Sequence, residues 1–272
     1  MCATCGCGDD GSVQVTVIGS DGAELAAHDH AHAHGLPHDH HDHPQEDDHP
    51  AHKIDLEAAV LAKNDKLAER NRGWLAGRGT VAINLMSSPG SGKTTLLERT
   101  IAEAAGDLDI SVIEGDQATT FDAQRIRATG APVVQVNTGA GCHLDADMVS
   151  RGLTALDPAA GSVVVIENVG NLVCPALFDL GESNRVVVMS VTEGSDKPLK
   201  YPHMFRAADV VVLNKIDLLP YVDFDEEAFA AAAVGLRPGL RIIKCSAKTG
   251  AGLEDWMNWL RDAARVTSDA SL

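Results

Sequence analysis

Seven short runs rich in Val and Ile recur along this chain, and most are separated by stretches long enough for a helix. Strands that are apolar on both faces belong in a covered parallel sheet, because half-exposed strands alternate apolar and polar residues. Strands that alternate with helices place those helices on both faces of the sheet. The sequence therefore predicts a doubly wound, mostly parallel α/β fold. The predicted strands are 80–86, 110–115, 132–137, 162–167, 185–191, 209–214 and 241–246, and helices are predicted at 93–105 and 145–156.

The first of these strands runs into SSPGSGKTT, residues 87–95. A strand, a Gly-rich turn and a Lys-Thr pair that opens a helix form a cradle for phosphate, built from backbone N–H groups and the helix N-terminus. Lys93 would reach the β and γ phosphates, and the Thr94 hydroxyl would bind Mg²⁺. Ser87 stands where the usual pattern has its first glycine. The alternative, a Gly-rich helix cap that binds no nucleotide, would not explain the presence of Lys93. The fold is thus of the P-loop NTPase type, with predicted phosphate-binding residues Gly90, Ser91, Gly92, Lys93, Thr94 and Thr95.

The segment VVVLNKID predicts which base is bound. Asn214, Lys215 and Asp217 follow a buried strand, where the Asp carboxylate can accept from both N1–H and the exocyclic amine of guanine. Adenine offers no such pair of donors, so the carboxylate would stay desolvated and unpaired. After the last strand, Ser246 and Ala247 can present backbone N–H groups to the guanine O6. The sequence therefore predicts a site for GTP and GDP.

Carboxylates end two further strands. Glu167 with Gly170 resembles the D-x-x-G pattern in which the Gly N–H meets the γ phosphate, with Glu in place of Asp. Asp116 follows the second strand at the carboxyl end of the sheet, where ligands bind in such folds. It would hold Mg²⁺ or water, although it could instead cap the next helix. The predicted catalytic residues are Lys93, Thr94, Asp116 and Glu167.

Cysteines form two candidate metal sites. Cys142 and His143 are adjacent in a Gly-rich loop, and Cys174 lies seven residues past Glu167. Thiolate and imidazole suit Zn²⁺ or Ni²⁺. These ligands are too few for a closed site, so a two-fold dimer would complete the set. Cys245, alone in its strand, is predicted to be a buried apolar residue.

The N-terminal part of the chain differs in composition. Residues 1–52 contain a Cys motif at residues 2–7 and a His-rich tract at 28–52, and this low-complexity stretch is predicted to be a mobile extension. SVQVTVIG within it alternates like a short strand but has no evident neighbour to pack on. A helix over 54–72 would lead into the globular domain, predicted to span 53–272.

Charge and hydropathy exclude several classes of partner. The chain has 39 acidic and 22 basic residues and a net charge of −17, which would repel nucleic acid and anionic membranes. No apolar run approaches the ~20 residues of a membrane span, and no signal peptide is evident. Six cysteines are too few for a disulfide scaffold of this length. We therefore expect a cytoplasmic protein.

Together these segments resemble the HypB family of hydrogenase nickel-incorporation GTPases. The resemblance rests on CATCGCG, the His-rich tract, SSPGSGKTTLLE, EGDQ, GCHLDA, ENVGNLVCP, TEGSDKPLKYP and NKIDL. It implies a dimerising GTPase that acts as a metallochaperone in [NiFe]-hydrogenase maturation, with a small zinc-binding protein and the hydrogenase large-subunit precursor as partners. It also implies a G-domain metal site at Cys142, His143 and Cys174, and a high-affinity nickel site at Cys2, Cys5 and Cys7.

Chemistry supports the N-terminal nickel site, because three thiolates and the α-amine supply four donors for a square-planar ion. A second C-x-x-C knuckle, which a zinc ribbon needs, is absent. Redox activity or adventitious metal scavenging remain alternatives there, and the histidines are interpreted as a weaker metal store or a spacer. Two other functions stay open for the whole chain: a urease accessory GTPase, which would carry Cys-Pro-His at the metal motif, and a nickel storage protein.

Overall fold

The computed structural model describes residues 14–18, 24–26, 50–117, 120–139 and 141–269. The strands are β1 (Gln14–Ile18), β2 (Glu24–Ala26), β3 (Val81–Ser87), β4 (Ile110–Asp116), β5 (Val133–Asn137), β6 (Val163–Gly170), β7 (Asn184–Ser190), β8 (Val210–Asn214) and β9 (Arg241–Lys244). The helices are α1 (Pro50–Gly77), α2 (Lys93–Glu103), α3 (Phe121–Ala128), α4 (Ala146–Leu156), α5 (Lys197–Lys200), α6 (Pro202–Ala207), α7 (Glu226–Leu236) and α8 (Leu253–Asp269). Three short 3-10 helices are η1 (Cys174–Ala176), η2 (Val191–Glu193) and η3 (Ile216–Tyr221).

The described strands form one sheet in the order β2-β1-β5-β4-β6-β3-β7-β8-β9. Every pair from β5 to β9 is parallel, and only β1 pairs antiparallel, with β5 and β2. All seven predicted strands are present, so the predicted α/β, mostly parallel fold is confirmed. The parallel strands bring their carboxyl ends to one edge of the sheet, where loops can build a site.

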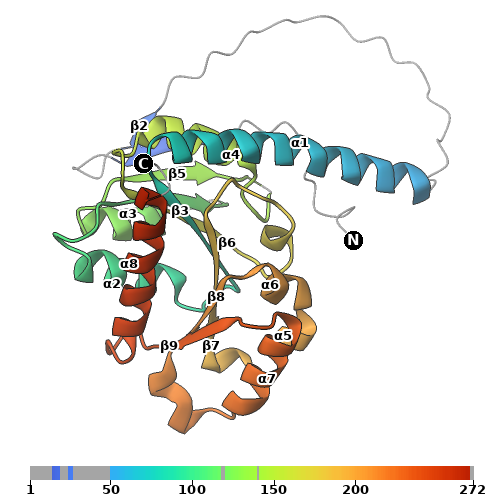
Figure 1. The fold of residues 1–272 in the computed structure, drawn as a ribbon, viewed down its shortest axis with the longest axis vertical. Coiled ribbons are helices and arrows are strands. Elements are labelled where there is room, and N and C mark those ends of the chain that lie inside the picture. Colours follow the sequence, from blue (N-terminus) through green and yellow to red (C-terminus); the bar gives the residue numbers. More distant parts are fainter. Residues whose placement is uncertain (1–13, 19–23, 27–49, 118–119, 140, 270–272) are drawn as a thin grey trace, which may run out of the picture.

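Helices cover both faces of this sheet (Figure 1). On β3, Ile83 and Leu85 face a core that also contains side chains of α2, α3 and α8. Ala82 and Met86 point to the opposite face, where α1 and α4 pack over one half of the sheet and α6 and α7 over the other. This burial on both sides is why the strands lack apolar–polar alternation.

The N-terminal strand corrects one expectation. The segment that seemed to lack a neighbour forms β1 and pairs with β5, with Val17 opposite Val134, and Ile18 is buried in the core. The sheet edge supplies a partner more than a hundred residues away, which no local pattern indicates. The Cys motif at residues 2–7 and residues 28–49 of the His-rich tract lie outside the described residues.

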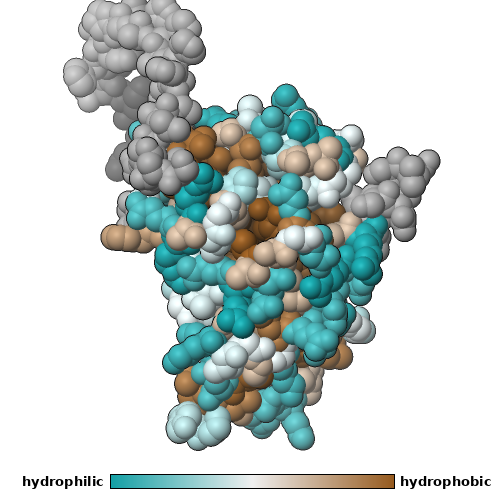
Figure 2. All heavy atoms as spheres, turned by 90° about the vertical axis from the view of Figure 1, so that its left-hand side faces the viewer, coloured by the Kyte–Doolittle hydropathy of each residue, from teal (hydrophilic) through white to brown (hydrophobic). Residues whose placement is uncertain are grey.

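The surface is polar over most of one side. Figure 2 shows the left-hand side of Figure 1, where brown apolar residues form several separate areas among teal hydrophilic ones. Among the helices that the structure describes, none combines the length and apolar character required to cross a membrane.

Candidate functional site

A cleft opens where β3 passes into α2. The loop between them contains Gly90 at φ 76° and Gly92 at φ 92°, a backbone region that favours glycine. A Cβ on Gly92 would lie 2.6 Å from Nδ2 of Asn214, so space as well as conformation requires glycine there. The cleft has a volume of about 590 Å³. Its lining includes Ser87, Ser88, Pro89, Gly90, Ser91, Gly92, Lys93, Thr94, Thr95, Asp116, Asp122, Arg125, Val169, Gly170 and Lys215.

Glu167 contacts two residues that line this cleft, and its side chain is only 2% exposed. Its Oε1 accepts hydrogen bonds from Lys93 Nζ at 3.0 Å and from Thr94 Oγ1 at 2.6 Å. Asp116 lines the same cleft from the end of β4. Helix α3 begins at Phe121 with Thr120 as its N-cap, so the alternative role of Asp116 as a helix cap is wrong. The structure thus brings the four predicted catalytic residues together.

Sequence reasoning missed Glu114. It pairs in register with Glu167 on the adjacent parallel strand and is 3% exposed. Burial, followed by the nearby carboxylate of Glu167, raises the pKa of Glu114 to about 9. Glu114 Oε2 and Glu167 Oε2 are buried without a hydrogen-bond partner among the described residues. Buried oxygens of this kind fit a divalent cation, which prefers carboxylate ligands. The signal was present, because an acid two residues before Asp116 shares its face of β4.

The raised pKa of Glu114 predicts a pH-dependent stability in the absence of metal and nucleotide. The folded carboxyl keeps its proton up to about pH 9, whereas the unfolded one loses it near 4.5. Stability therefore declines as pH rises between these values. We expect Glu114→Gln, which stays neutral, to raise Tm by ~2 °C or more at pH 8, the equivalent of ~1 kcal/mol, and to change it little at pH 5.

The measurement is thermal unfolding in EDTA across this pH range. The matched control is Glu103→Gln, because the Glu103 side chain is 47% exposed at the end of α2 and forms an ion pair with Arg99 on the same helix. This control should show no pH-dependent gain. If the Tm values of Glu114→Gln and of the unchanged protein vary with pH in parallel, the Glu114 carboxyl ionises normally in the folded protein.

The predicted base-binding residues converge on the same edge of the sheet. Asn214 Nδ2 donates to Ser91 O at 3.0 Å, and its Oδ1 accepts from Ala247 N at 3.0 Å. The Asn214 side chain therefore ties the phosphate loop to the segment after β9. Ser246 Oγ donates to Asp217 Oδ1 at 2.6 Å. This bond orients a half-buried carboxylate beside the backbone of the predicted guanine pocket.

Lys215 crosses from this base segment to the phosphate loop. Its Nζ donates to Gly90 O at 2.6 Å, and its own backbone is left-handed at φ 62°. The aliphatic part of the side chain passes near Gly92. Lys215 therefore lines one side of the cleft and links the predicted base segment to the phosphate loop.

Cys142, His143 and Cys174 meet on neighbouring loops, with one potential ligand atom from each within 4.8 Å of the others. The two Sγ atoms are 3.0 Å apart, and Cys142 Sγ is 3.7 Å from His143 Nδ1. Burial lowers the pKa of His143, against the opposing effect of the Asp145 carboxylate. A neutral imidazole beside two thiols is suited to a soft or borderline metal ion. It is the only such cluster of three among the described residues.

Cys245 is separate from this cluster. It is fully buried, and burial raises the pKa of its thiol to about 12. A thiol that stays protonated at neutral pH is a poor ligand and nucleophile. The prediction that Cys245 is a buried apolar residue is confirmed.

Two asparagines, which sequence reasoning also missed, connect the metal cluster to the nucleotide cleft. Asn168, next to Glu167, accepts from the backbone N–H of Leu144 at 3.1 Å. Asn171 donates to Cys142 O at 3.3 Å. The end of β6 therefore contacts the phosphate loop through Glu167 and the metal-binding loop through these two amides.

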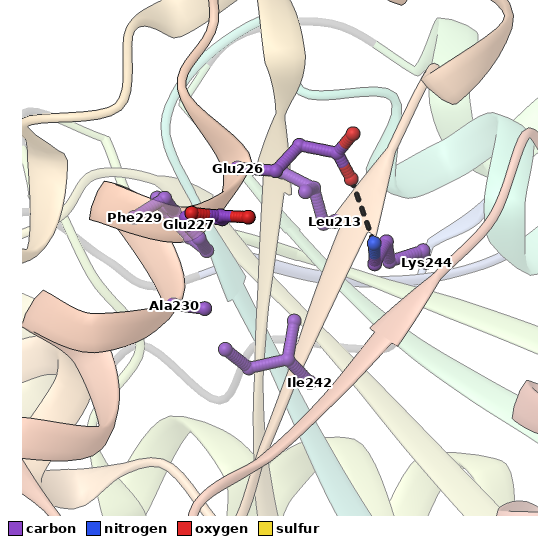
Figure 3. Close-up of a pocket in the computed structure, with 7 residues that line it drawn as sticks. All are labelled: Leu213, Glu226, Glu227, Phe229, Ala230, Ile242 and Lys244. Carbon is purple, nitrogen blue, oxygen red and sulfur yellow. Dashed lines mark hydrogen bonds and ion pairs between the residues drawn. The ribbon is translucent and has the colours of Figure 1, made fainter.

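A second, smaller pocket of about 190 Å³ lies between α7, β8 and β9 (Figure 3). Its walls are mainly apolar, and Glu226 and Lys244 form an ion pair at 2.8 Å across its rim. The residues that line it are Leu213, Glu226, Glu227, Phe229, Ala230, Ile242 and Lys244. None of the predicted site residues is among them.

The chain is similar to known proteins in sequence and in fold. Residues 81–244 match the family described as CobW/HypB/UreG, nucleotide-binding domain. The hydrogenase maturation factor HypB of Escherichia coli K12 is 56% identical over 207 residues, which cover 76% of this chain and 71% of that protein. The crystal structure of HypB from Archaeoglobus fulgidus is 44% identical with a TM-score of 0.70, covering 75% of this chain and 100% of the other. HypB from Helicobacter pylori, solved in complex with nickel, is 40% identical with a TM-score of 0.70, covering 75% and 95%.

Proposed function

Because the chain belongs to the CobW/HypB/UreG family, and within it to the hydrogenase maturation factor HypB, we propose that it binds nickel and uses GTP to control nickel insertion into [NiFe]-hydrogenase. HypB proteins are GTPases of hydrogenase maturation. The observation that carries the proposal is the connection at the end of β6. There Glu167 contacts the phosphate loop, and Asn171, four residues on, contacts the loop of Cys142.

In the proposed reaction, the backbone around Gly92 and the N-terminus of α2 bind the phosphates of GTP. Lys93 leaves Glu167 and contacts the β and γ phosphates, and the N–H of Gly170 meets the γ phosphate. Thr94, Asp116 and Glu167 would hold Mg²⁺ through their side-chain oxygens, and the ion would neutralise charge on the phosphate oxygens. Asp217 and the backbone after Ser246 select guanine.

Nickel is the cargo in this proposal. Cys142, His143 and Cys174 offer two thiolates and one imidazole, and a second copy of the chain would supply further ligands across a homodimer. Zn²⁺ would fit the same donors. Cys2, Cys5 and Cys7, with the α-amine, are proposed as a separate high-affinity nickel site, and the His-rich tract as a weaker store.

The proposed setting follows from the family. The partners are a small zinc-binding hydrogenase maturation protein and the precursor of the hydrogenase large subunit, and the place of action is the cytoplasm. Neither nucleic acid nor a membrane is proposed as a partner, because acidic residues outnumber basic ones by 39 to 22.

Deletion of the gene and complementation test this function. We expect the deletion to abolish [NiFe]-hydrogenase activity, wild-type protein to restore it, and Cys142→Ala to restore much less although it still binds GTP. Loss of urease activity with intact hydrogenase would instead indicate a urease accessory GTPase. Full hydrogenase activity in the deletion strain, together with no GTP turnover by the purified protein, would indicate a nickel store.

A further inference from the structure

Helix α1 lies across the two segments that carry the metal-binding side chains. The first segment runs from Cys142 into the start of α4 at Ala146, and the second runs from Cys174 through the loop that ends near Gly181. His143 and Phe178 join these segments at the site itself, with ring centroids 4.0 Å apart. The distance between the two segments therefore determines how far the thiol of Cys174 lies from Cys142 and His143.

Asn64 of α1 makes one hydrogen bond to each segment. Its Oδ1 accepts from Ala146 N at 2.9 Å, and its Nδ2 donates to Asp179 O at 2.7 Å. Asn64 is only 5% exposed. Water is therefore a poor substitute for either partner, and losing one would leave a buried backbone group unsatisfied.

Asn71, two helical turns further on, repeats this arrangement. Its Nδ2 donates to Ala146 O at 2.8 Å and to Leu180 O at 3.0 Å, and the residue is 3% exposed. Asn64 and Asn71 together satisfy both backbone polar groups of Ala146. Each also reaches the second segment, so both asparagines bridge the two ligand-bearing segments.

The second segment is fitted closely to the backbone of α1. Gly181 has φ +87°, and a Cβ there would lie 2.5 Å from Ala68 O and 2.8 Å from Arg72 N. Arg72 also donates to both carboxylate oxygens of Asp179 at 2.8 Å. Glycine at this position permits a close contact with the backbone of α1 that any side chain would prevent. The close contact and the Arg72–Asp179 bonds together fix the position of this segment on the helix.

We propose that α1 is the positioning element of the metal site, with Asn64 and Asn71 as positioning residues that hold Cys142, His143 and Cys174 at coordinating distance. The inference rests on the proposed metal-binding function. Helix α1 begins at Pro50, where the Cys- and His-rich N-terminal segment ends in sequence. The element that positions the G-domain site is thus the one that connects it to the N-terminal nickel ligands.

Co²⁺ titration of the full-length chain tests this proposal. The parent carries Ala at Cys2, Cys5 and Cys7, so that a thiolate-to-cobalt charge-transfer band reports Cys142 and Cys174, since Cys245 is fully buried. Histidine-bound cobalt does not produce this band. In this parent, Cys142→Ala should abolish the band. If the parent shows no such band, the metal site itself is refuted, and the positioning role with it.

Asn64→Ala and Asn71→Ala should each lower the Co²⁺ affinity at least tenfold and shift the cobalt spectrum, while GTP affinity changes less than twofold. The matched control is Leu260→Ala, which removes a fully buried side chain of α8 from the core on the opposite face of the sheet, a cluster that contains no residue of either segment. It should lower Tm comparably and leave the Co²⁺ affinity and spectrum unchanged.

Two results would overturn the positioning role while leaving the metal site intact. One is a parent-like affinity and spectrum in both asparagine variants, and the other is an equal loss of Co²⁺ affinity in Leu260→Ala. If the alanine variants lose GTP binding and so are misfolded, Asn64→Asp replaces them. It keeps the oxygen that accepts from Ala146 and replaces the amide that donates to Asp179. A lowered Co²⁺ affinity and a shifted spectrum with GTP affinity retained would then support the positioning role, and parent-like values would overturn it.

Discussion

Asp217→Asn should lower GTP affinity by ~100-fold or more and raise the affinity for xanthosine triphosphate. Asp217 lies in the segment after β8, and its carboxylate is oriented by a hydrogen bond of 2.6 Å from Ser246 Oγ, which follows β9. The Asp217 carboxylate would accept hydrogen bonds from N1–H and from the exocyclic amine of guanine. The side chain of Asn has only one acceptor oxygen, so its NH₂ group would face one of these two guanine donors. Xanthine carries a carbonyl in place of that amine and accepts the new donor. Buried polar mismatches of this kind give large discrimination.

Calorimetry with both nucleotides measures this change in specificity. Asn has almost the same volume as Asp, so Tm without nucleotide should change little, and this serves as the internal control for folding. Asp223→Asn, a substitution of an exposed residue six positions further along the chain, should bind both nucleotides as the wild type does. Unchanged GTP affinity in Asp217→Asn would remove Asp217 from the base site.

Glu167→Gln should lower kcat for GTP hydrolysis by ~100- to 1,000-fold, the usual effect of losing one preorganised electrostatic group. Gln keeps the shape of Glu and can still accept from Thr94 Oγ1, now 2.6 Å away. It loses the negative charge that faces Lys93 at 3.0 Å and that is proposed to bind Mg²⁺. KM should change much less, because the backbone around Gly92 still binds the phosphates.

Steady-state hydrolysis at saturating Mg²⁺ gives both constants. Glu103→Gln on the exposed end of α2 is the matched control, and we expect wild-type kcat for it. A Glu167→Gln enzyme with unchanged kcat would exclude this carboxylate from the reaction. A large rise in KM with unchanged kcat would instead assign it to ground-state binding alone.

Local patterns predicted the sheet because each parallel strand is rich in Val, Ile and other apolar residues, and because most strands are separated by enough chain to form a helix. They also predicted the phosphate loop, because its glycines and Lys93 are contiguous in sequence. Glu114 could have been found, because it lies two residues before Asp116 on the same face of β4, but the sequence does not show that it pairs with Glu167 on another strand.

Contacts between distant segments were beyond these patterns. The partner of β1 lies over a hundred residues away in β5. The bonds of Asn64 to Ala146 and Asp179 span 82 and 115 residues. A polar residue within a helix that is predicted from its apolar spacing looks like a solvent-facing position. Only the folded chain shows that Asn64 is buried between two loops.

The central claim is that the nucleotide and the metal affect each other through the end of β6. Glu167 contacts Lys93 and Thr94, while Asn168 and Asn171 hydrogen-bond the loop of Cys142 and His143. Rearrangement of this segment on loss of the γ phosphate should therefore change the metal site. Linkage requires the reverse effect on nucleotide affinity by the same factor.

The most direct test is Ni²⁺ titration of the full-length chain with Ala at Cys2, Cys5 and Cys7, followed by the thiolate-to-nickel charge-transfer band. The titration is done with GDP and with a non-hydrolysable GTP analogue, and the oligomer size is measured in both states. The account predicts affinities that differ by ~5- to 150-fold between the two nucleotides. It also predicts that Cys142→Ala removes the difference and keeps nucleotide binding. Identical nickel affinity and identical oligomer size in the two states would contradict the account.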